Sequence, residues 1–177
     1  MNTEVPLKDI EQKASVIASE HFRKGLNCAE SVYKAIQDVG LVEFPPETVA
    51  LATAFGGGIG LYGGVCGALA GLTMAVSAVH GRKQPWAEEH QDIIDQLYGN
   101  PGLYRFFNQI PEQFQKKFGS TTCQELISDY QEWFDNQRFC QCRYIVMEST
   151  IMAVQFITQG NEEGYCQAFG RNMAGKE

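Results

Sequence analysis

The sequence predicts an all-α protein, folded as one compact helical bundle that spans residues 1–177 as a single domain. Apolar residues recur at three- and four-residue spacing along much of the chain, which is the period of an amphipathic helix. No alternating strand pattern and no hairpin turn signal interrupts it. A chain of 177 residues with 44% hydrophobic residues is also long enough to bury one core.

Glycine, proline and asparagine divide the helical pattern into separate segments. The pattern is clearest in residues 9–22, 29–39, 88–98 and 104–118. Residues 142–158 are apolar on most sides and rich in β-branched residues, so a strand is the alternative there. Their length and the central Glu148 and Ser149 favour a buried helix. The aromatic residues of 104–118 follow helical spacing, which is typical of a core helix or of the surface of a homodimer.

The stretch "AFGGGIGLYGGVCGALAG", residues 54–71, contains a Gly-x-Gly-x-x-Gly spacing. In a dinucleotide site such glycines follow a strand, and an acidic residue comes about 20 residues further on. Neither feature is present, and the Gly-Lys-Ser/Thr of a nucleotide-binding P-loop is missing as well. The sequence therefore argues against a phosphate-binding role.

Residues 49–79 carry no charge, so a membrane span is another alternative for this region. Its glycines would leave backbone polar groups unpaired in lipid. We expect instead a glycine-rich loop between two buried helices. Gly63, Gly67 and Gly71 recur at every fourth position, which gives a helix face smooth enough for close packing against a neighbour.

Charge and composition narrow the function further. The formal net charge is −7 and the 14 Lys and Arg residues form no long run, which argues against nucleic acid as a partner. The N-terminal residues mix acids and bases without an apolar core, unlike a signal peptide. We predict a cytoplasmic protein without a membrane span. In a reducing compartment, six cysteines favour metal binding or thiol chemistry over structural disulfides.

Two of the cysteines follow capping sequences. In "NCAE", Asn27 is a helix cap with a glutamate three residues on, and "TCQE" repeats that arrangement from Thr122. Serine, threonine, asparagine or aspartate followed by such a glutamate is typical of a helix start. Cys28 and Cys123 are therefore expected in the first turns of two different helices.

The other two cysteines of interest also lie at predicted helix starts. Cys66 directly follows the glycine-rich loop, and Cys142 opens the helix of residues 142–158. A helix N-terminus carries partial positive charge and favours the thiolate, which ligates metals and attacks disulfides. Arg143, next to Cys142, either stabilises a thiolate or lies in solvent. The alternative for each cysteine is a buried residue that acts only as a small hydrophobe.

The order of these cysteines resembles the C_GCAxxG_C_C family of redox-active proteins. Cys28, then "CGALAG" at residues 66–71, then Cys123 and Cys142 match its four cysteines and its signature. The resemblance covers most of the chain and implies a small helical protein, cytoplasmic, with no defined enzymatic activity. A related domain in certain multihaem-type cytochromes implies an iron-sulfur cluster on the four cysteines. The haem part does not carry over, because no Cys-x-x-Cys-His is present, and no role is assigned to Cys140 and Cys166.

Three functions remain open, and whether the protein is an enzyme is left open with them. The favoured one is electron transfer or redox sensing, with a redox partner protein, through an iron-sulfur cluster on the four cysteines. The second is a thiol-disulfide oxidoreductase in which two thiols cycle and Cys140 or Cys142 resolves. The third is a non-catalytic helical scaffold that binds zinc or nothing. The wide spacing lacks the Cys-x-x-Cys pairs of common zinc, ferredoxin and thioredoxin sites.

Overall fold

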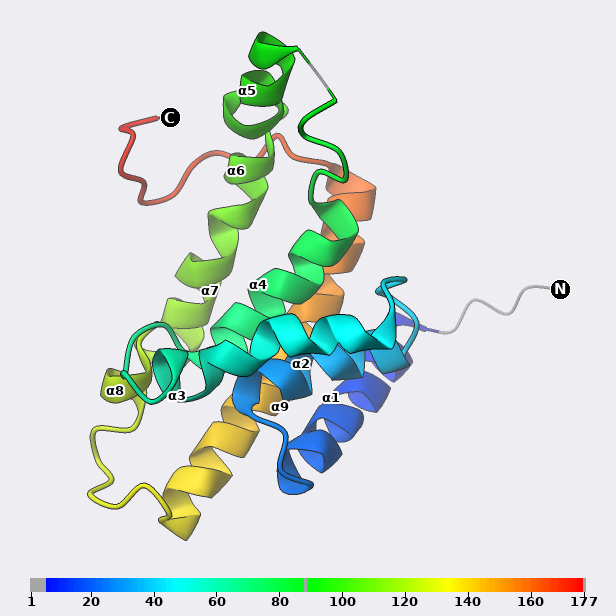
Figure 1. Ribbon diagram of the computed structural model, residues 1–177. Coiled ribbons are helices and arrows are strands. Elements are labelled where there is room, and N and C mark those ends of the chain that lie inside the picture. The colour runs from blue at the N-terminus through cyan, green and yellow to red at the C-terminus, as the bar shows by residue number, and fades with distance from the viewer. Residues whose placement is uncertain (1–5, 88, 177) are drawn as a thin grey trace, which may run out of the picture.

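The computed structural model describes residues 6–87 and 89–176, and helices account for most of them (Figure 1). In chain order the elements are α1 (Leu7–Arg23), α2 (Cys28–Asp38), the 3₁₀ helix η1 (Pro46–Phe55), α3 (Gly56–Ile59), α4 (Gly67–His80), α5 (His90–Tyr98), α6 (Leu103–Phe107), α7 (Gln109–Phe118), α8 (Cys123–Leu126) and α9 (Asn136–Glu163). Within the described residues, the β-type pairing is confined to an isolated bridge between Val65 and Thr122. The all-α prediction is confirmed.

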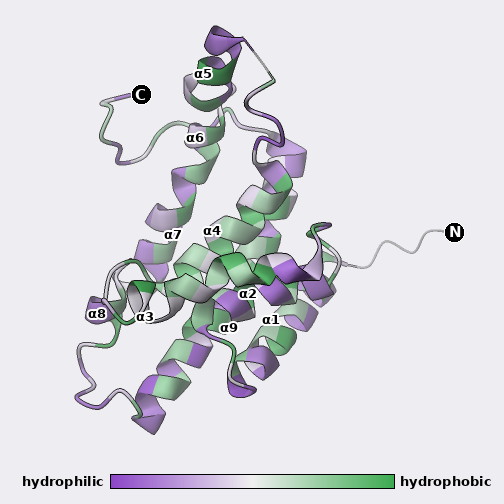
Figure 2. Ribbon diagram, in the orientation of Figure 1, coloured by the Kyte–Doolittle hydropathy of each residue, from purple (hydrophilic) through white to green (hydrophobic). Residues whose placement is uncertain are grey.

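The long helix α9 forms the spine of the core. It packs against α1, α2 and α4 and runs behind α2 and α4 in Figure 1. Its buried side includes Ile145, Val146 and Phe156, so the prediction of a buried helix over residues 142–158 is confirmed. Helix α1, by contrast, carries hydrophilic and hydrophobic residues along its length, as a helix with one face in the core does (Figure 2).

Helix α4 approaches α2 closely because glycine lies at the contact. A Cβ atom at Gly71 would lie 2.5 Å from the carbonyl oxygen and 2.9 Å from the Cα of Ala29. A Cβ at Gly67 would lie 2.8 Å from the carbonyl oxygen of Phe55. The expected close packing is confirmed for these two glycines. Gly63 precedes the helix and faces the side chain of Gln124, so it is not part of that face.

We predict that Gly71→Ala destabilises the protein by about 1–3 kcal/mol, the usual range for overpacking. Helix propensity alone would stabilise this change by up to about 1 kcal/mol, but the contact with the Ala29 backbone outweighs it. Urea unfolding measures the difference. Ser77→Ala, at an exposed position of α4, is the matched control and should change the free energy of unfolding by less than about 0.5 kcal/mol. Equal or greater stability of the Gly71 variant would contradict the close contact.

The segment before the glycine-rich loop is not a buried helix, which corrects half of the prediction. It is the 3₁₀ helix η1, in which Ala52 is buried while Leu51 is 67% exposed. The hydroxyl of Thr48 donates to the carbonyl of Pro45 (2.7 Å) and tightens its first turn. With three residues per turn, the run of apolar residues cannot keep one face on the core as an α-helix does.

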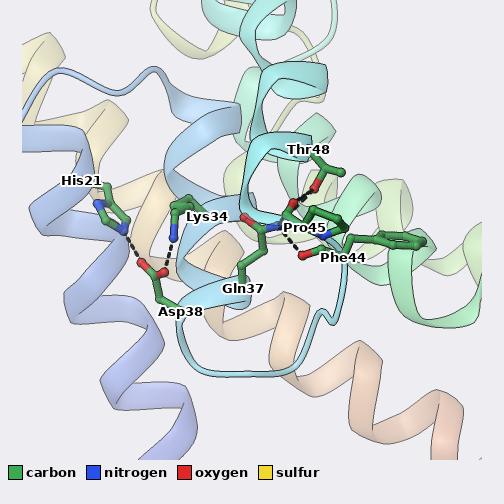
Figure 3. A network of polar contacts seen from close by, with 7 residues as sticks. All are labelled: His21, Lys34, Gln37, Asp38, Phe44, Pro45 and Thr48. Carbon is green, nitrogen blue, oxygen red and sulfur yellow. Dashed lines mark hydrogen bonds and ion pairs between the residues drawn. The ribbon is translucent and has the colours of Figure 1, made fainter.

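Polar contacts attach this region and α1 to α2 (Figure 3). The amide of Gln37 donates to the carbonyls of Phe44 (3.3 Å) and Pro45 (3.1 Å). At the next residue, the carboxylate of Asp38 accepts from Lys34 and lies 2.7 Å from Nε2 of His21 on α1. These contacts hold the η1 segment and α1 on either side of the C-terminal half of α2.

Candidate redox centre

The four cysteines named from the sequence meet around one small cavity. It lies where the starts of α2, α4 and α8 face α9, and its lining consists of Cys28, Cys66, Gly67, Ala68, Cys123, Leu126, Ile127, Cys142 and Ile145. The lining side chains other than the thiols are apolar. All six cysteines of the chain are free, and Cys140 and Cys166 are exposed and outside this lining. The four thiols therefore lie together in one subunit, as the prediction of one cluster on these cysteines requires.

Cys28 is the first residue of α2, as predicted. The side-chain oxygen of Asn27 accepts from the backbone N–H groups of Ala29 (2.9 Å) and Glu30 (3.0 Å). The N–H of Asn27 in turn donates to the Glu30 carboxylate at 2.9 Å. This reciprocal capping box fixes where α2 begins and hence where the Cys28 thiol points.

Cys123 is the first residue of α8, but the predicted cap at Thr122 is wrong, because its side chain makes no capping hydrogen bond. Glu125, the expected capping partner, accepts from the hydroxyl of Ser120 instead. The N–H of Cys123 donates to the carbonyl of Gly64 at 2.7 Å. The start of α8 is therefore held by the glycine-rich loop, and the amide of Cys123 is not free to stabilise a thiolate.

The glycine-rich loop packs closely against Cys123. Gly58 has φ of 71°, and a Cβ there would lie 2.6 Å from the nitrogen of Gly64 and 2.9 Å from the Cβ of Cys123. Only glycine fits this left-handed, crowded position. The N–H groups of Gly63 and Gly64 donate to the carbonyls of Gly57 and Gly58. Because these donors are used within the loop, the loop is not a phosphate cradle.

Cys66 lies at the start of α4 as predicted, but its side chain makes no capping hydrogen bond and its environment does not favour the thiolate. The nearby backbone of Ala68 and Leu69 acts to lower the pKa of the Cys66 thiol. Burial is the larger effect and raises the pKa of the Cys66 thiol to about 11. The expectation that a helix start alone yields a thiolate is therefore wrong here, because desolvation outweighs the helix dipole.

The pKa of the Cys142 thiol is lowered, whereas that of Cys66 is raised, and a helix start is not the cause. Helix α9 begins at Asn136, after a cap formed by Asp135, so Cys142 lies beyond the first turn and the prediction that it opens a helix is wrong. A hydrogen bond with the Cys28 thiol nevertheless lowers the pKa of Cys142 to about 7, against the effect of burial and with help from Arg138. The same contact, together with burial, raises the pKa of Cys28. Of this pair, Cys142 is therefore the thiol that ionises more readily.

Arg138 is the functional residue that the sequence reasoning missed. It is only 8% exposed, and its Nη1 donates to the sulfur of Cys142 at 3.6 Å. Its guanidinium lies 4.1 Å from the ring centroid of Trp133. The spacing of Arg138 and Cys142 could have indicated this contact, because residues four apart share a helix face. Arg143, which is adjacent to Cys142, does not share its face.

The four thiols are a suitable ligand set for a thiolate-bound metal group, but the space between their sulfurs is too small for one. Four soft thiols without a competing carboxylate suit iron-sulfur or zinc ligation. The cavity has about 10 Å³ of room, which is at the lower limit for one water molecule. Within residues 6–87 and 89–176, no group of three or more His, Cys, Asp or Glu side chains is arranged to hold a metal ion. A cluster would require the four thiols to move apart.

The fold and the site define an all-helical protein with one centre of four thiols. The chain belongs to the C_GCAxxG_C_C family: residues 26–156 match the family model described as "Putative redox-active protein (C_GCAxxG_C_C)". This confirms the resemblance found in the sequence. Neither the curated proteins nor the solved structures contain a significant match. No helix in the described part of the chain is long and apolar enough to cross a membrane.

Proposed function

We propose that the protein carries electrons or senses redox state through a single centre on Cys28, Cys66, Cys123 and Cys142, and that this centre binds an iron-sulfur cluster. The observation that carries the proposal is the convergence of four thiols from four separate helices on one cavity with otherwise apolar walls. A dithiol needs two such thiols, whereas a cluster needs about four. Four cysteines at one point, three of them buried, are more than core packing requires.

The surroundings of the thiols suit a buried redox group. Arg138 donates a hydrogen bond to the sulfur of Cys142, and hydrogen bonds to ligand sulfurs are one means by which proteins tune cluster potentials. Arg138 places a positive charge beside Cys142 and offsets the negative charge that thiolate ligands bring. Apart from the thiols, the lining of the small cavity contains no polar side chain. When bound, a cluster supplies one-electron chemistry that thiols alone do not.

A second candidate is dithiol-disulfide chemistry between Cys142 and Cys28, favoured by their direct contact and by the Cys142 pKa of about 7. The Cys142 thiolate would attack one sulfur of a substrate disulfide and release the other as a thiol. Cys28 would then displace the second substrate thiol and close the Cys28–Cys142 disulfide. The substrate gains two electrons and two protons, and the protein loses the same. Cys140 is exposed and does not line the cavity, so it has no part in this scheme.

Chemical analysis of protein purified without oxygen separates these functions. We expect iron and acid-labile sulfide bound together, with visible absorbance that is bleached by dithionite and restored by an oxidant. Colourless protein that contains zinc would support the scaffold function instead. Metal-free protein in which two thiols disappear on oxidation would support the dithiol. Either of these results would overturn the iron-sulfur proposal.

The cellular setting follows from the same chemistry. Six free cysteines suit the reducing cytoplasm, where we propose that the protein works with a redox partner protein. Homodimer formation remains a prediction of the aromatic pattern.

A further inference from the structure

A second and larger cavity adjoins the four-thiol centre. Its volume is about 440 Å³, and its lining includes three of the thiols, those of Cys28, Cys123 and Cys142. Large apolar side chains form most of the remaining wall: Phe22, Leu61, Trp133, Phe134 and Phe139. The cavity reaches the surface, because Leu61 is 65% and Phe134 is 92% exposed. A ligand of one or two rings fits a cavity of this size.

Arg138 is the charged side chain in this lining, and no carboxylate of the described residues forms an ion pair with it. Its Nε donates to the carbonyl of Trp133, and its Nη1 donates to Cys142. A guanidinium has five N–H donors, so most of its donors lack an acceptor in the described part of the chain. None of the guanidinium nitrogens is both buried and without a hydrogen-bond partner, so the remaining donors are open to solvent or to a ligand. The sulfur of Cys142 accepts from one of the others.

We propose that the cavity of about 440 Å³ binds a small organic anion with a flat apolar body, whose acidic group pairs with Arg138. The aromatic walls suit a planar body: Phe22 and Phe139 stack with ring centroids 4.8 Å apart, and the Trp133 ring already covers one side of the guanidinium. The planar fork of arginine suits a carboxylate or sulfonate. The bound molecule then lies beside the thiols, where a redox substrate or effector would be placed.

This inference needs only the cavity and Arg138, and it does not rest on the presence of a cluster. A simpler role for Arg138 is that of a counter-ion to Cys142 alone. That role predicts no preference of the cavity for anions over neutral molecules of the same shape. A pair of probes that differ only in charge therefore separates the two.

The test uses two fluorescent probes on protein purified without oxygen: anilinonaphthalene sulfonate, and phenylnaphthylamine, which has the same rings without the sulfonate. We expect the sulfonate to bind at least about tenfold more tightly, because tenfold is only about 1.4 kcal/mol and a charge-assisted hydrogen bond contributes at least that much. Arg138→Gln should weaken the sulfonate about tenfold and change the neutral probe less than about twofold. Arg138→Lys keeps the charge but not the fork and should be intermediate.

Two further variants locate the binding. Lys176→Gln is the matched control, because Lys176 lines a different apolar cavity, formed with Tyr98, Tyr104 and Phe107; it should leave both probes unchanged. Phe134→Ala, at a position 92% exposed, should keep the fold and weaken both probes. If Arg138→Gln does not fold, the sulfonate preference of the natural protein and the weaker binding of both probes to Phe134→Ala decide whether the proposal holds.

Several results would overturn the proposal. One is equal affinity of the natural protein for the two probes. Another is an equal loss of affinity for both probes in folded Arg138→Gln, which would mean that the cavity holds them through apolar contacts only. A third is loss of the sulfonate in Lys176→Gln, which would place the probe in the other cavity. Iron analysis of the same samples reports on the cluster separately.

Discussion

In metal-free protein, Cys142 is expected to be alkylated with a half-maximal rate near pH 7, where its thiolate begins to dominate. At pH 7 a thiol with a pKa of about 7 is about half ionised, against roughly 3% for an ordinary cysteine with a pKa of about 8.5. Cys66, whose pKa is about 11, should stay unreactive through pH 9. Iodoacetamide labelling at a series of pH values, with each cysteine identified by mass spectrometry, measures this.

Two variants identify the cause of the Cys142 pKa. Cys28→Ala removes the hydrogen bond that lowers this pKa most, so the midpoint should move to higher pH. Arg138→Gln removes the nearby positive charge and its hydrogen bond to the sulfur, and should also move the midpoint upward. Both changes raise the pKa of Cys142, because each removes a group that favours the thiolate over the thiol. Exposed Cys140, two residues away on α9, is the internal control. A midpoint for Cys142 that neither variant moves would contradict the assigned causes.

Local signals in the sequence were enough to predict the helices and part of the site. The capping box at Asn27 is complete within four residues, so it identified the start of α2 and the place of Cys28. The order of the four cysteines carried the family resemblance, and the convergence of their thiols agrees with it. These features depend on contacts between residues close in the chain or on a motif that spans it.

The errors arose where tertiary contacts decide the local structure. The start of α8 looked like a capping box, but its amides bond to the glycine-rich loop, which comes from far earlier in the chain. The Asp135 cap places Cys142 beyond the first turn of α9, and the cysteine owes its pKa to Cys28 and Arg138 rather than to a helix end. Burial of Cys66 depends on the packed core and cannot be read from its helix position.

The larger cavity was beyond sequence reasoning for the same reason. Its walls combine Phe22 of α1, Leu61 of the glycine-rich loop and Trp133 from the connection between α8 and α9. No pattern in the sequence links these three residues. Arg138 could have been found from its spacing to Cys142, but its lack of a carboxylate partner is visible only in the folded chain.

The central claim is that four thiols act as one centre, and bound iron in Cys66→Ser beside Cys166→Ser tests it most directly. Cys66 is 6% exposed at the small cavity, whereas Cys166 is exposed and outside it. Serine changes the volume little but is a poor ligand for iron, which clusters bind through thiolates. Cys66→Ser should therefore lose most of its iron and visible absorbance while keeping its helical circular dichroism, and Cys166→Ser should keep all three. Equal iron in the two variants, or a greater loss in Cys166→Ser, would contradict the account.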